Sequence, residues 1–109
     1  MESLQIYESN KSSTFKIKWN RIPKAESEWQ FFDLTKPEIM ETVIREFFQT
    51  EILHVSIGRK DSYSVEKGKI FQKIHFILGQ KDFKIWDEHF TQVMELSEHA
   101  AYRTGKSVF

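Results

Sequence analysis

The sequence predicts an α+β domain in which one antiparallel sheet of about five strands is covered on one face by two helices. Residues 14–22, 51–57 and 69–78 alternate their side chains with the two-residue period of a strand. Residues 35–49 and 82–105 instead carry apolar side chains at helical spacing. A chain of 109 residues has the length of one domain with its own core. We therefore expect residues 1–109 to form a single domain.

The first third of the chain predicts three strands. Residues 4–7 form a short alternating run, and residues 9–13 are a polar cluster typical of a turn. In residues 14–22 the apolar side chains point one way and the lysines the other, as in a half-buried antiparallel strand. Residues 23–27 break this strand, and the aromatic-rich segment 29–34 is expected to be the next one.

A helix is expected to begin at Thr35. Its hydroxyl can accept a hydrogen bond from the helix amide at Glu38, and the Glu38 carboxylate can reach back to the Thr35 amide. Pro37 suits the first turn, where its missing N–H costs nothing. The helix is expected to end near Gln49, and its apolar stripe consists of Ile39, Met40, Val43, Ile44, Phe47 and Phe48.

Two further strands and a second helix complete the predicted order β-β-β-α-β-β-α. Residues 51–57 and 69–78 are the strands, and the polar segment 58–68 is the loop between them. Asp82 is a suitable N-cap for the last helix, and Gly105 a suitable terminator. The apolar stripe of this helix consists of Phe83, Trp86, Phe90, Val93, Met94, Ala100 and Ala101.

Composition excludes several classes of protein. Sixteen basic residues balance sixteen acidic ones, so the chain is not a polyelectrolyte. The absence of cysteine excludes a disulfide scaffold, a thiol nucleophile and a thiolate metal site. The first residues lack the features of a signal peptide, and no apolar run is long enough to span a membrane. These observations predict a cytoplasmic protein that does not bind membranes.

Basic residues gather on one predicted sheet face. If the helices cover the face with Ile17, Leu53 and Ile74, the other face is open and basic. The adjacent loop 58–68 adds further cations. The candidate binding residues on this face and loop are Lys16, Lys18, His54, Arg59, Lys60, Lys69, Phe71, Lys73 and His75.

The titratable residues do not form a recognisable catalytic or metal-binding motif. His54 and His75 fall on the same predicted sheet face, but two imidazoles need a third ligand to hold a metal. Glu95 and His99 are four residues apart on the predicted last helix, which suits a charge pair. We therefore expect no metal site, no cofactor and no catalytic residue.

A non-catalytic binding module is the leading functional hypothesis. It would act through protein–protein contact, as inhibitors, immunity proteins and adaptors do, on a partner with an acidic surface. The second hypothesis is a single-stranded nucleic-acid-binding protein, because aromatic and basic residues on a sheet can stack bases and pair phosphates. Two plainer interpretations are a solvated lysine-bearing face and a face buried in a homodimer.

Overall fold

The computed structural model describes residues 1–22 and 27–108, which form an α+β fold with one antiparallel sheet, as predicted. In chain order the elements are α1 (Ser3–Thr14), β1 (Ile17–Trp19), β2 (Gln30–Phe31), α2 (Glu38–Phe47), β3 (Ile52–Ser56), β4 (Tyr63–Glu66), the 3₁₀ helix η1 (Lys67–Lys69), α3 (Ile70–Ile74), β5 (Phe83–Asp87), β6 (Gln92–Ser97) and β7 (Ala101–Ser107).

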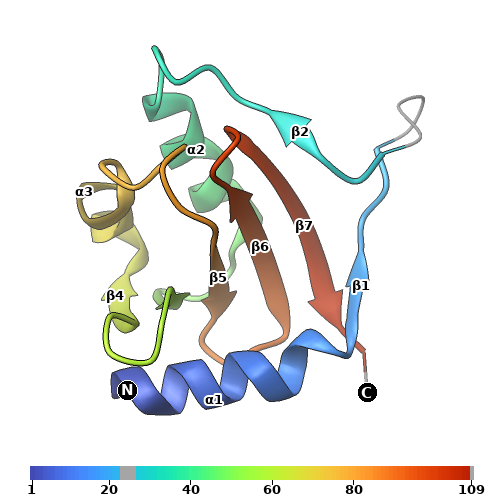
Figure 1. The fold of residues 1–109 in the computed structure, drawn as a ribbon, viewed down its shortest axis with the longest axis vertical. Coiled ribbons are helices and arrows are strands. Elements are labelled where there is room, and N and C mark those ends of the chain that lie inside the picture. Colours follow the sequence, from blue (N-terminus) through green and yellow to red (C-terminus); the bar gives the residue numbers. More distant parts are fainter. Residues whose placement is uncertain (23–26, 109) are drawn as a thin grey trace.

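The strand order across the sheet is β1-β7-β6-β5-β3-β4, and every pairing is antiparallel (Figure 1). Strands β5, β6 and β7 are joined by short turns into a meander at the centre of the sheet. Strand β2 pairs with β7 beside its first residues, whereas β1 pairs with its last ones. Strand β4 therefore lies at one end of the sheet, and β1 and β2 lie at the other.

Helices α2 and α3 cover one face of the sheet. Met40 and Ile44 of α2 and Ile70 and Ile74 of α3 are buried against the apolar side chains of the strands. Burial of such side chains contributes about 1.5–3 kcal/mol each, so this cluster supplies most of the apolar stabilisation. The strand side chains in the cluster are Leu53, Val55, Val65, Phe83, Ile85, Met94 and Leu96.

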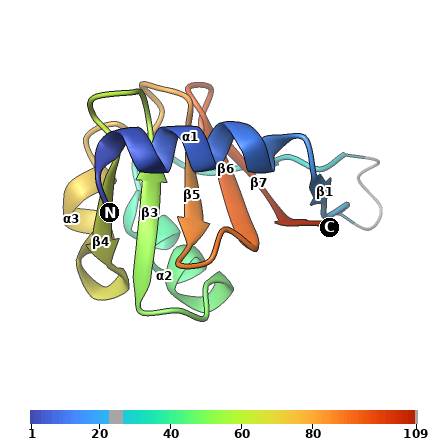
Figure 2. The same ribbon diagram turned by 90° about the horizontal axis from the view of Figure 1, so that it is seen from below.

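Helix α1 covers part of the opposite face, where it crosses β3, β5 and β6 (Figure 2). Its fully buried Ile6 packs in a second cluster with Trp86, Phe90 and Val93. The Trp86 indole N–H also donates a hydrogen bond of 2.9 Å to the side-chain oxygen of Asn10. The helices therefore lie on both faces of the sheet rather than on one, which corrects the predicted layer arrangement.

The first predicted strand and the turn after it are wrong, because residues 4–7 and 9–13 belong to α1. The predicted strands 14–22 and 29–34 are confirmed over the shorter spans of β1 and β2. Phe15, expected on the core face, is 92% exposed. Apart from Ser27, the predicted break at 23–27 lies outside the described residues.

The helix predicted after residue 35 is confirmed as α2, but its capping differs. The Thr35 amide and hydroxyl both donate to the Asp33 carboxylate, at 2.9 and 2.6 Å. These bonds lower the pKa of Asp33 and take the Thr35 side chain away from the helix. The N-cap position of α2 is Pro37, which has no side-chain capping bond. The turn at Asp33 therefore replaces the predicted capping box.

The strand predicted at 51–57 is confirmed as β3, but the later assignments are wrong. The predicted loop 58–68 contains β4, and the predicted strand 69–78 is η1 and α3 followed by turns. The predicted helix 82–105 is the meander of β5, β6 and β7. Both faces of β5 and β6 are buried, so their apolar residues form runs instead of the alternation of a half-buried strand.

Gly105 lies in β7 opposite Trp19, not at the end of a helix. A Cβ atom at this position would lie 2.7 Å from the Lys18 carbonyl oxygen and 3.0 Å from an atom of the Trp19 ring. The glycine therefore allows β1 and its indole to approach β7 closely. Within residues 1–22 and 27–108, the helices are too short or too polar to cross a membrane.

Candidate binding surface

Two of the predicted binding residues lie at the β1 end of the sheet. Lys18 is exposed on β1 and pairs in register with Lys106 of β7, which is also exposed. Lys16 is exposed just before β1, and its carbonyl accepts a hydrogen bond from the Val108 amide. Lys16 and Lys18 are thus separated by the width of the sheet from the predicted binding residues that lie next to β4.

His54 is buried under α1 instead of lying on an open face. Only 5% of it is exposed, and its ring stacks on Phe90 at 4.9 Å between centroids. One ring nitrogen lies 2.8 Å from the Ser64 hydroxyl and the other 3.0 Å from the Glu88 carbonyl oxygen. Burial is the main cause that lowers the pKa of His54, so the neutral imidazole is favoured. Its ring is therefore not presented to a partner.

The Ser64–His54 pair has the short separation that a nucleophile and its base require. Its second ring nitrogen can donate to a backbone carbonyl, a bond that orients the ring. However, the ring is enclosed by α1, Phe90 and the strands, and neither residue lines the cavity described below. This pair is therefore best explained as a hydrogen bond that satisfies a buried polar group.

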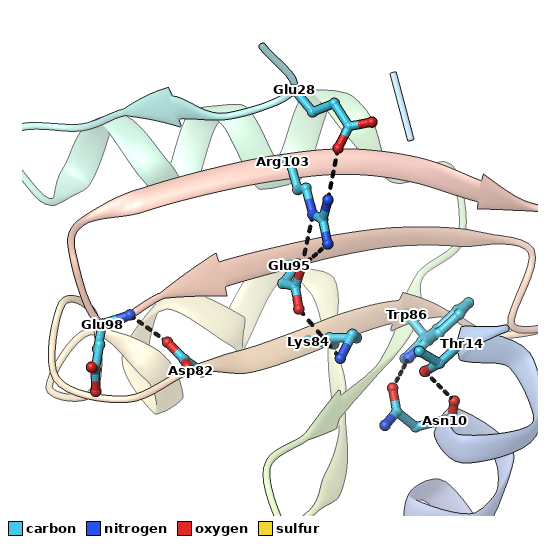
Figure 3. A network of polar contacts seen from close by, with 9 residues as sticks. All are labelled: Asn10, Thr14, Glu28, Asp82, Lys84, Trp86, Glu95, Glu98 and Arg103. Carbon is cyan, nitrogen blue, oxygen red and sulfur yellow. Dashed lines mark hydrogen bonds and ion pairs between the residues drawn. The ribbon is translucent and has the colours of Figure 1, made fainter. Parts of the chain in front are cut away.

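The part of this sheet face beyond α1 carries charges that neutralise one another (Figure 3). Arg103 of β7 lies between Glu95 of β6 and Glu28, with nitrogen–oxygen distances of 2.7 Å to both carboxylates. Lys84 of β5 lies 3.4 Å from the other oxygen of Glu95. The four side chains form a continuous row across the strands, in which each cation is paired. This face is therefore not the open basic surface expected from the sequence.

Two indoles complete the surroundings of Arg103. Its guanidinium carbon lies 3.8 Å from the centroid of Trp19 and 4.7 Å from that of Trp29. Such cation–π contacts suit arginine, because its planar group stacks on aromatic rings while its N–H groups bond carboxylates. This arrangement was not predicted, because it depends on strand pairing between residues far apart in the chain.

Four other predicted binding residues lie together on η1, α3 and the turn that follows. Lys69 ends η1, where it pairs with Glu66 at 3.8 Å, and Phe71 packs on the core. Lys73 and His75 are exposed. The His75 ring contacts the Phe71 ring at 5.8 Å between centroids. These four residues therefore lie on one helical segment and its flanks, and not on the strand face that was predicted.

A groove opens between this helix and the β3–β4 region. Its volume is about 440 Å³, and its walls are mostly apolar. One wall is formed by α3 and the turns after it, and the other by the end of β3, the following loop and β4. We call it the α3 groove, and its lining residues are Ile57, Asp61, Tyr63, Gln72, Lys73, Phe76, Ile77 and Lys81.

Four polar groups of the α3 groove have no partner among the residues that the structure describes. Within the described part of the chain, the ammonium groups of Lys73 and Lys81 make no ion pair, and Asp61 makes none either. The Tyr63 hydroxyl likewise has no hydrogen-bond partner among those residues, and partial burial raises its pKa. Phe76 leaves 67% of its surface exposed at the same place. The groove thus combines apolar walls with polar groups that are available for hydrogen bonds and ion pairs with a bound molecule.

The remaining predicted residues, Arg59 and Lys60, lie in the loop between the α3 groove and the start of α1. The Arg59 guanidinium lies 6.0 Å from the centroid of Tyr7, and its carbonyl accepts a 2.7 Å hydrogen bond from the Ser3 hydroxyl. The Ser62 amide donates to the same hydroxyl at 2.9 Å. The loop that carries Asp61 is therefore fixed to α1 on its far side.

Of the described residues that line the α3 groove, Lys73 alone belongs to the predicted binding residues, and Tyr63, Phe76 and Lys81 are among those that were missed. The sequence held a signal for one of them, because Lys73, Phe76 and Ile77 have the spacing of residues on one helix face. Assigning residues 69–78 to a strand placed Lys73 and Phe76 on opposite faces. Tyr63 and Lys81 depend on tertiary packing, so their local sequence holds no such signal.

Among the residues described, no group of three or more histidine, aspartate or glutamate side chains is placed to hold a metal ion. His54 and His75, once expected on one face, lie on opposite sides of the sheet. Searches against protein-family models, curated proteins and solved structures found no match to this chain. The α3 groove is therefore the surface whose geometry indicates a function.

Proposed function

We propose that the protein is a small, non-catalytic intracellular binding module that acts through protein–protein contact, and that the α3 groove is its contact surface. The observation that carries the proposal is the exposed Phe76 ring in one groove with Lys73 and Lys81, which form no ion pair within residues 1–22 and 27–108. Aromatic side chains in a partly enclosed site, with charged groups around them, are typical of the centre of protein interfaces.

Charge pairing elsewhere on the molecule supports this choice of surface. Lys84 and Arg103 on the sheet face are held by Glu95 and Glu28, so a partner there would have to break existing ion pairs. Lys73 and Lys81 in the groove can pair with an acidic partner without such a loss. The expectation of an acidic protein partner therefore moves from the sheet face to the α3 groove.

The test is a pull-down with the tagged protein from a lysate of its own host, divided into nuclease-treated and untreated halves. The proposal predicts a discrete protein that is retained in both halves. Retention of nucleic acid, with the proteins lost after nuclease treatment, would contradict it and favour the nucleic-acid hypothesis. Gel filtration of the purified chain over a range of concentrations reports whether the chain associates with a second copy of itself.

A charge-reversal pair makes the pull-down specific to the groove. In the Lys73→Glu/Lys81→Glu variant the proposal predicts loss of the retained protein. The matched control is Lys18→Glu/Lys106→Glu, which changes the same charge at exposed positions across the sheet. If the groove variant retains the partner as well as the control variant does, the partner binds elsewhere.

A further inference from the structure

The two walls of the α3 groove differ in chemistry. The helical wall carries Lys73 and Lys81, which bracket Phe76 and Ile77 in the sequence. The opposite wall carries one carboxylate, that of Asp61, together with the apolar parts of Ile57 and Tyr63. Two cations against one anion leave the groove with a net positive charge, and that charge lies on the helical side.

The apolar part of the groove can enclose a side chain. Of its apolar lining residues, Ile77 is almost fully buried, whereas Phe76 is mostly exposed. A volume of about 440 Å³ lies within the usual range for ligand sites, of about 300–1,000 Å³. A large apolar group that enters the groove would remove the Phe76 ring from water, and burial of an aromatic ring is a major source of binding energy.

We propose that the α3 groove receives one large apolar side chain from a segment of the protein partner, flanked in that segment by carboxylates that pair with Lys73 and Lys81. This inference rests on the proposed function and names the chemistry that the partner presents. The apolar side chain supplies the burial, and the carboxylates supply the pairing that these lysines lack within the described residues. Asp61 lies on the wall opposite to the lysines and repels any carboxylate of the partner that approaches that wall. It therefore favours the orientation of the segment in which the carboxylates face the lysines.

The same features favour a peptide over a nucleic acid. A nucleic-acid site neutralises several phosphates along a continuous basic track. The α3 groove is lined by two lysines and by one aspartate, Asp61. A phosphodiester chain would meet that carboxylate, whereas an acid-flanked apolar side chain can keep its charges on the helical side.

The experiment is an NMR titration of the ¹⁵N-labelled full chain with three hexapeptides. The first has phenylalanine and leucine at its centre and two acidic residues at each end. The second keeps the apolar centre but replaces the acids by their amides, and the third keeps the acids around two central alanines. Oligothymidylate serves as the nucleic-acid probe. The proposal predicts saturable shifts at Tyr63, Lys73, Phe76 and Lys81 with the first peptide, and far smaller shifts with the others.

Two variants check the assignment. Lys73→Glu/Lys81→Glu is expected to weaken the binding of the first peptide by at least about tenfold, and Lys18→Glu/Lys106→Glu to leave it unchanged. The spectrum of each free variant reports whether it is folded. The proposal would be overturned by equal shifts with all three peptides, by no binding, by stronger shifts with oligothymidylate, or by shifts that appear with protein concentration alone.

The inference about the groove's occupant and the proposed function can fail independently of each other. If the hexapeptides do not bind but the lysate yields a nuclease-resistant protein partner, the binding-module function stands and the occupant of the groove is wrong. If no protein partner is retained, the proposed function fails whatever the peptides do.

Discussion

Replacing Arg103 by methionine removes the centre of the charged row on the sheet and keeps much of the side-chain volume. The variant loses two hydrogen bonds, one to Glu95 and one to Glu28, each with a nitrogen–oxygen distance of 2.7 Å. It also loses the cation–π contacts of the guanidinium with the rings of Trp19 and Trp29. The substitution therefore tests whether these contacts stabilise the sheet, as the geometry indicates.

The expected loss of stability follows from the burial of Arg103. Breaking a fully buried ion pair costs about 3–5 kcal/mol, and an exposed pair contributes about 0–1 kcal/mol. The Arg103 side chain is 21% exposed, and Lys84 remains near Glu95 after the substitution, so part of the charge stays compensated. We expect Arg103→Met to lower the free energy of unfolding by about 2–3 kcal/mol.

The assay is urea unfolding followed by tryptophan fluorescence, with Arg45→Met as the control. Arg45 and Glu41 form an exposed pair on α2, so the control is expected to lose less than about 0.5 kcal/mol. A loss below about 0.5 kcal/mol for Arg103→Met as well would refute the argument. It would mean that the row of charges is too solvated to stabilise the sheet.

Three further changes probe the fold. Ala100 has a φ of +58°, a conformation that glycine adopts more easily than alanine. Ala100→Gly is therefore expected to raise the free energy of unfolding by about 0.5–1 kcal/mol and so to raise the urea midpoint. A lower midpoint would contradict this. Gly105→Ala is expected to cost about 1–3 kcal/mol in the same assay, whereas Gly68→Ala, which meets no atom within 4 Å, is expected to cost far less. Burial lowers the pKa of His54 below its ordinary 6.5, so its contribution to stability is present above that pH and is lost as the pH falls below it. Unfolding at about pH 7.5 and about pH 5 is therefore expected to differ more in the wild type than in His54→Gln, and equal differences would contradict the role of burial.

The fold class was predictable from the sequence because two strong local patterns survive in the structure. Residues 38–47 carry a wide apolar stripe, and Met40 and Ile44 are indeed buried. In residues 52–56, Leu53 and Val55 point into the same cluster. The helical period dominates in the first segment and the two-residue period of a strand in the second, so periodicity alone identifies each element.

The C-terminal meander could not be predicted in this way. Strands β5 and β6 lie at the centre of the sheet and are covered on both sides, so their apolar residues also match a helical stripe. The turns that join the strands contain neither glycine nor proline, and the positive φ angles fall on Phe90 and Ala100. The usual turn signals were therefore absent.

The candidate site was predictable only in part. Lys73 was identified from its charge, but its neighbours depend on α3 packing against the region of β4. The pairing of Arg103 with Glu28 and Glu95 was invisible, because it joins residues up to 75 positions apart. Lys84, Glu95 and Arg103 were moreover assigned to the predicted last helix, so their row on the sheet face was not expected.

The most direct test of the account is the affinity of the retained partner protein for three forms of the chain, measured by isothermal titration calorimetry. The account predicts that Lys73→Glu/Lys81→Glu weakens binding by at least about tenfold, and that Lys18→Glu/Lys106→Glu binds like the wild type. If the groove variant binds as tightly as the wild type, or if only the β1-end variant is impaired, the α3 groove is not the contact surface.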